Sequence, residues 1–188
     1  MARVLVACVG NIFLGDDGFG TEVAAALGSR AQGGRALPEE VRVEDFGIRS
    51  VHLVYELLGG YDVLVLVDTV AHQPGPAGTL YVIEPELPAR DPGADPLPEV
   101  MLDAHDLSPG GVMSLVPTLG GSVGRIVVVG CQPGSLEEGI GLTEEVRAAV
   151  EPAAELVRRL VEEELDRLRS TTIHGAGTRR ESDEEVTT

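Results

Sequence analysis

The chain has 188 residues, of which 43% are hydrophobic, and a formal net charge of −17 at pH 7. This length and hydrophobic content suffice for one domain around a single core, and the strong negative charge argues against nucleic acid or an anionic membrane as a partner. All 14 basic residues are arginine, which excludes mechanisms that need a lysine, such as a P-loop or a Schiff base.

The first predicted unit is a strand, a loop and a helix. The apolar run 4–9 predicts a buried strand, and residues 21–27 predict a helix. The glycine-rich loop between them carries Asp16 and Asp17, and in open α/β proteins ligands bind at such loops. Because adjacent carboxylates repel phosphate and attract a cation, the loop predicts part of a metal site. The alternative for either aspartate is a cap of the following helix.

The remaining elements alternate along the chain. We expect further strands at 41–46, 61–67, 79–83 and 125–130, and helices at 50–58, near 109–119 and at about 143–168. The short turn before 79–83 predicts an antiparallel neighbour, and Pro152 predicts a kink or a restart in the last helix. These elements predict a three-layer α/β/α fold with a mostly parallel twisted sheet of about five strands. The expected domain covers 1–169, followed by a disordered acidic and polar tail at 170–188.

Further candidate ligands lie at strand ends and in loops. Asp68 directly follows the predicted strand 61–67, and His105 lies in a later loop before a predicted helix. With Asp17 they offer carboxylate oxygens and an imidazole nitrogen, a donor set that suits nickel, iron or zinc better than magnesium. The alternatives are that Asp68 caps a turn and that His105 binds backbone. Asp45, at the end of the second predicted strand, is a weaker candidate for the same edge.

The other histidines and the cysteines carry weaker signals. His52 and His72 are expected at the surface or in loops, and His174 falls in the predicted tail. Cys8 and Cys131 lie in or at the end of apolar runs without a C-x-x-C spacing, which is typical of core residues. No signal peptide or membrane-spanning run is evident, so a soluble cytoplasmic protein is expected.

Several segments together resemble a known family. The run 10–20 is similar to the G-N-x-L-x-x-D-[DE]-G-x-G signature of the [NiFe]-hydrogenase maturation endopeptidases. The resemblance continues through 45–49, 67–70, 78–81, 103–107 and 139–143, in the right order. It extends from about residue 3 to residue 165, and is therefore more specific than a single motif.

The resemblance implies an endopeptidase that removes the C-terminal extension of a hydrogenase large-subunit precursor after nickel insertion. The family's metal-binding and catalytic positions fall on Asp17, Asp68 and His105. We further expect that the nickel is carried by the precursor, that no organic cofactor is needed and that the enzyme is a monomer. Water polarised by the metal and water activated by a carboxylate are both open as routes of cleavage.

Two other classes share part of this pattern. A receiver-like signalling domain also has an acidic pair after its first strand and an aspartate after its third, but the chain has no lysine to complete that site. A nucleotide-binding α/β module would use the first glycine loop, but the acidic pair opposes phosphate and the glycines are not spaced as G-x-G-x-x-G.

Overall fold

The computed structural model describes residues 2–28, 36–71, 73–85 and 121–177. Strands, helices and one 3₁₀ turn follow each other in the order β1 (Val4–Val9), η1 (Gly15–Gly18), α1 (Phe19–Gly28), β2 (Val41–Gly47), α2 (Ser50–Leu57), β3 (Tyr61–Thr69), β4 (Leu80–Ile83), β5 (Val123–Cys131) and α5 (Glu144–Gly177). The predicted helix near 109–119 lies outside the described residues. The other predicted elements are present within a few residues of their expected bounds, except that the last helix extends beyond its expected end.

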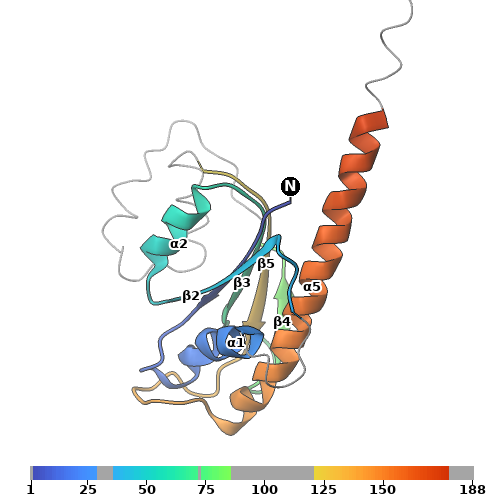
Figure 1. Cartoon of the computed structure of the whole chain (residues 1–188). Coiled ribbons are helices and arrows are strands. Elements are labelled where there is room, and N and C mark those ends of the chain that lie inside the picture. Colours follow the sequence, from blue (N-terminus) through green and yellow to red (C-terminus); the bar gives the residue numbers. More distant parts are fainter. Residues whose placement is uncertain (1, 29–35, 72, 86–120, 178–188) are drawn as a thin grey trace, which may run out of the picture.

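The strands form one five-stranded sheet in the order β2-β1-β3-β5-β4. β1 pairs in parallel with β2 and β3, β3 pairs in parallel with β5, and β4 is antiparallel to β5. The predicted mostly parallel sheet and its antiparallel member are thus confirmed. The parallel strands all end at the lower side of Figure 1, so the segments that follow them share one edge.

Alternating side chains of the strands build a core on each face of the sheet. Even-numbered residues of β1, such as Val4 and Val6, pack with α1 and α5, whereas Leu5 and Ala7 pack with α2. Figure 1 shows the same division, with α2 on one side of the sheet and α1 and α5 on the other. This alternation follows from the two-residue period of a strand. Cys8 and Cys131 are buried in the first of these clusters and are free thiols, as predicted.

The last helix differs from its prediction. α5 is continuous through Pro152, so of the two predicted alternatives, a kink or a restart, the restart is wrong. The helix ends at Gly177, so the segment 170–177, which was assigned to the disordered tail, is helical. Extending an existing helix by one residue adds a backbone hydrogen bond without the cost of nucleating a new helix. The end of α5 can therefore form without burying side chains. The hydroxyls of Ser170 and Thr171 also donate to backbone carbonyls one turn back. Residues 178–188 lie outside the described part.

Within the described ranges, no helix is both long enough and apolar enough to cross a membrane.

Candidate functional site at the carboxyl edge of the sheet

The loop after β1 folds back on itself at Gly10. The amide of Asn11 donates to the carbonyl of Asp17 at 3.1 Å and to Oδ2 of the same residue at 2.9 Å. A Cβ on Gly10 would lie 2.0 Å from the Asp17 carbonyl oxygen, so only glycine permits this turn. The loop therefore fixes both the backbone and the carboxylate of Asp17 close to the end of β1.

Asp17 and Asp68 are joined through Thr69, the last residue of β3. The Thr69 hydroxyl donates to Asp17 Oδ1 at 3.0 Å, and the Thr69 amide donates to Asp68 Oδ1 at 2.7 Å. Both aspartates are partly buried. The sequence prediction that these carboxylates meet at one edge is consistent with this geometry, because β1 and β3 are paired neighbours.

The position of Asp68 changes the acidity of its carboxyl group. The pKa of Asp68 is raised from 3.8 to about 7, mainly by burial and also by the nearby charge of Asp17, while the hydrogen bond from the Thr69 amide opposes the shift. A carboxyl group with a pKa near neutrality can accept and release a proton at physiological pH. The pair thus combines a carboxylate held by two donors with a carboxyl group suited to proton transfer.

Asp16 is directed away from this pair. It is fully buried, and its carboxylate accepts hydrogen bonds from the amides of Gly134, Ser135 and Thr143 at 2.7, 2.9 and 2.6 Å. The Thr143 hydroxyl adds a further bond at 3.0 Å. Burial alone would raise the pKa of Asp16, but these donors outweigh it and lower the pKa below its ordinary value. Asp16 is a structural anion and not a partner of Asp17 at a cation site.

Sequence reasoning missed the loop to which Asp16 binds. Residues 132–143 follow β5 and lie against the first loop (Figure 1), through a bridge between Leu14 and Gly139 and the bond from Asp16 N to Ser135 O. The resemblance at 139–143 was the available signal, but it did not indicate a contact with the first loop. The two loops together form the rim of the site.

Large apolar side chains are exposed on these loops. We call Ile12, Phe13, Leu136 and Ile140 the apolar rim, and their exposed fractions are 45%, 62%, 44% and 82%. The amide of Gly139 donates to the Phe13 carbonyl at 2.9 Å, which keeps the two halves of the apolar rim together. Exposed apolar side chains gathered beside a polar site are typical of surfaces that bind another polypeptide.

The remaining predicted residues fall elsewhere. His105 and His72 lie outside the described residues, and His52 is exposed on α2. The Asp45 carboxylate accepts hydrogen bonds from the Gly47 amide at 2.9 Å and from the Thr21 hydroxyl at 3.3 Å. These bonds give Asp45 a structural role. Among the described residues, no group of three or more His, Cys, Asp or Glu side chains is arranged to hold a metal ion.

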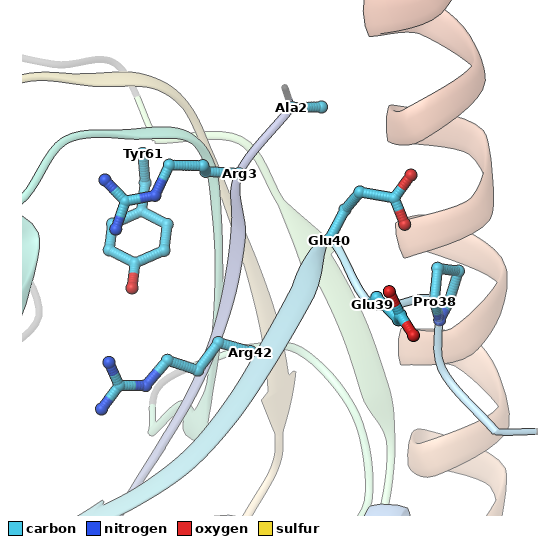
Figure 2. A pocket seen from close by; sticks show the side chains of 7 residues that line it. All are labelled: Ala2, Arg3, Pro38, Glu39, Glu40, Arg42 and Tyr61. Atoms are coloured by element: carbon cyan, nitrogen blue, oxygen red, sulfur yellow. The ribbon is translucent and has the colours of Figure 1, made fainter.

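A separate pocket lies at the opposite edge of the sheet (Figure 2). Its volume is about 570 Å³, and Arg3, Arg42 and Tyr61 are among the residues that line it. Both cations have partners, because the Arg3 guanidinium stacks on the Tyr61 ring at 4.6 Å and Arg42 pairs with Glu44 and Glu56. The first contact joins the starts of β1 and β3, and the ion pairs lie within β2 and between β2 and α2. Both arginines are thus used by contacts within the fold, and we do not take the pocket as the candidate active site.

The chain is similar to several known proteins. The profile of the family described as hydrogenase maturation protease, HycI, matches residues 26–160. The hydrogenase 2 maturation protease of Escherichia coli K12 is 32% identical over 155 residues, which cover 82% of this chain and 88% of the relative.

Solved structures agree with this similarity. The hydrogenase maturating endopeptidase HybD of E. coli has a TM-score of 0.64 at 28% identity, covering 86% of this chain and 93% of that one. The hydrogenase 2 maturation peptidase of a Thaumarchaeota archaeon has a TM-score of 0.60 at 32% identity, covering 85% and 97%. The chain belongs to the hydrogenase maturation protease family.

Proposed function

We propose that this chain is an endopeptidase that removes the C-terminal extension of a [NiFe]-hydrogenase large-subunit precursor after nickel has been inserted. The family membership supports hydrolysis of a peptide bond and a hydrogenase precursor as substrate. The observation that carries the proposal for the site is the pair of carboxylates, Asp17 and Asp68, linked through Thr69 at the carboxyl edge of the sheet. We further propose that the enzyme is monomeric and cytoplasmic and that it needs no organic cofactor.

The site would recognise nickel that arrives with the precursor. In this proposal Asp17 and Asp68 supply oxygen ligands, and His105, placed by the resemblance alone, supplies the nitrogen. Three protein ligands do not complete the coordination of a transition metal, so the precursor's own ligands share the ion. Recognition then requires the metal and the polypeptide together.

The chain's own groups suggest how the peptide bond is attacked. Without a metal the pKa of Asp68 is raised to about 7; with one Asp68 oxygen on the metal, the other oxygen would be the base that takes a proton from an attacking water and returns it to the leaving amine. Asp17, whose oxygens accept bonds from Asn11 and Thr69, keeps a fixed orientation beside it. Nickel in the substrate would supply Lewis-acid polarisation of the water or the carbonyl.

The surroundings favour a polypeptide substrate over the two other classes. The apolar rim offers contacts to a protein partner next to the acidic pair. A receiver-like cation site requires both adjacent carboxylates at one ion. The Asp16 carboxylate instead accepts hydrogen bonds from the amides of Gly134, Ser135 and Thr143. A nucleotide-binding role would place phosphate beside the carboxylate of Asp17, which is electrostatically unfavourable.

The test uses purified protein and three forms of the precursor: nickel-loaded, zinc-loaded and metal-free. The release of the C-terminal extension is followed by mass spectrometry. We expect cleavage of the nickel-loaded form only. Efficient cleavage of the metal-free form would overturn recognition of the metal, and failure to cleave any form would overturn the proposed activity itself.

A further inference from the structure

We infer that Thr69 is a positioning residue that fixes the Asp17 carboxylate relative to Asp68. The inference rests on the proposed function of this site, but its structural part can be tested without activity. Thr69 lies at the end of β3, where it pairs with Cys131 of β5, so its backbone is held by the sheet. It is among the described residues the only one that donates a hydrogen bond to both carboxylates.

The two donations from Thr69 have different chemical origins. The bond to Asp68 Oδ1, at 2.7 Å, comes from the backbone amide and survives any ordinary substitution. The bond to Asp17 Oδ1, at 3.0 Å, comes from the side-chain hydroxyl and depends on the identity of the residue. A substitution at this position can therefore release Asp17 while leaving the bond to Asp68 in place.

Asp17 is held at both oxygens, and Thr69 supplies one of the two donors. The Asn11 amide donates to Oδ2 at 2.9 Å, and the Thr69 hydroxyl donates to Oδ1. A carboxylate bonded at one oxygen can still turn about both χ1 and χ2, whereas donors at both oxygens fix the two torsions together. Without the hydroxyl, Asp17 keeps its charge and its loop but loses its orientation toward Asp68.

The branched side chain of threonine makes this arrangement stiff. Two heavy atoms on Cβ restrict the χ1 torsion, so the hydroxyl is presented in one direction. Serine offers the same donor with more rotational freedom, and valine has nearly the same shape with no donor. Thr69→Ser and Thr69→Val therefore separate the hydrogen bond from the packing.

The first experiment measures cleavage of the nickel-loaded precursor by the wild type and both variants. We expect Thr69→Val to lower kcat about tenfold or more, in the range of losses typical for residues that orient metal ligands, with little change in KM. Thr69→Ser is expected to restore most of kcat. Thr79→Val is the matched control, because its hydroxyl bonds the Pro76 carbonyl at 2.7 Å in an exposed turn, and we expect it to retain full activity.

A second measurement keeps the inference testable if the precursor is not cleaved. Three-bond NMR couplings report the χ1 rotamer of Asp17 directly. We expect a single rotamer in the wild type and in Thr69→Ser, and averaged couplings in Thr69→Val.

The outcomes separate the two levels of the proposal. A wild type that cleaves no precursor but shows the expected Asp17 couplings supports the positioning role and removes the proposed function. A wild type that cleaves normally, together with a Thr69→Val variant of unchanged kcat and unchanged Asp17 rotamer, would overturn the inference. A drop in kcat that Thr69→Ser fails to rescue would also overturn it, because packing would then explain the loss.

Discussion

The carboxylate of Asp16 accepts a hydrogen bond from each of the two donors of Thr143, its amide and its hydroxyl. The Thr143 amide donates to Oδ1 at 2.6 Å and its hydroxyl donates to Oδ2 at 3.0 Å. Thr143 immediately precedes α5, so Asp16 also satisfies an amide at the positive end of a helix. These bonds join the first loop to the segment before α5, although the two are far apart in the chain. They therefore also restrict the loop that carries Asp17.

The first prediction concerns this lock between the loops. Asp16→Ala leaves four donors without their acceptor in a buried site, which we expect to lower the free energy of unfolding by about 3 kcal/mol. Asp16→Asn is not expected to restore the lost stability. Both oxygens of Asp16 accept hydrogen bonds, so the NH₂ group of asparagine would face a donor. Urea unfolding measures the change, and Asp166→Asn, at an exposed position on α5, is the control.

The pH dependence of stability follows from the lowered pKa of Asp16. A group whose pKa is depressed on folding stabilises the fold while it is ionised, and this contribution is lost as pH falls through the folded-state pKa. The wild type is therefore expected to lose stability in acid more steeply than Asp16→Asn. Parallel acid titrations of the two proteins, followed by circular dichroism, measure the difference, and identical curves would contradict the role assigned to Asp16.

The contribution of Asp68 to stability is expected to change with pH in the opposite direction. Its pKa is raised on folding to about 7, so the folded state binds more protons than the unfolded state between the ordinary carboxyl value and pH 7. Stability then falls as pH rises through this window. We expect Asp68→Asn to be more stable than the wild type at pH 8 by on the order of 2 kcal/mol, after allowance for partial exposure, and nearly equal to it at pH 4.

The measurement compares thermal unfolding of both proteins across this pH range, in the presence of a chelator so that no bound metal contributes. The same substitution is expected to abolish cleavage, because it removes the proton acceptor. A variant that is less stable than the wild type at pH 8 would show that Asp68 is not held in a desolvated position.

The placement of Asp17 and Asp68 at the same edge of the sheet could be predicted from the sequence, because it follows from strand pattern and strand order. A strand that ends in an aspartate, placed beside the first strand in a parallel sheet, brings Asp68 toward Asp17, and both positions were identified from the sequence. The bonds of Asp16 were not predictable, since their donors are 118 to 127 residues away. Whether adjacent carboxylates share one ion or point apart is decided by such tertiary contacts, which periodicity and spacing do not encode.

The assignment of catalytic residues is tested by removing each in turn. We expect Asp17→Ala, Asp68→Ala and His105→Ala to remain folded and to lose processing of the nickel-loaded precursor. His52 is exposed on α2, and His52→Ala is expected to process normally. Cleavage is followed by mass and folding by circular dichroism. An inactive His52→Ala beside a fully active His105→Ala would mean that the wrong histidine has been assigned.

The last prediction concerns the apolar rim as the surface that contacts the precursor. Phe13 and Ile140 are 62% and 82% exposed, on loops joined by the bond from Gly139 to Phe13. Because exposed side chains contribute little to folding, Phe13→Ser and Ile140→Ser are expected to leave the melting temperature unchanged within experimental error.

Their effect is expected in binding. Removing a large apolar contact from an interface typically costs about 1 to 2 kcal/mol, or about five- to thirtyfold in affinity, so KM for the precursor is expected to rise by that factor while kcat is retained. Tyr55→Ser is the matched control, because Tyr55 is 67% exposed on α2, away from the rim. Equal changes in KM for Tyr55→Ser and Phe13→Ser would assign the effect to general surface hydrophobicity, whereas a rise confined to the rim variants would locate the precursor beside Asp17 and Asp68.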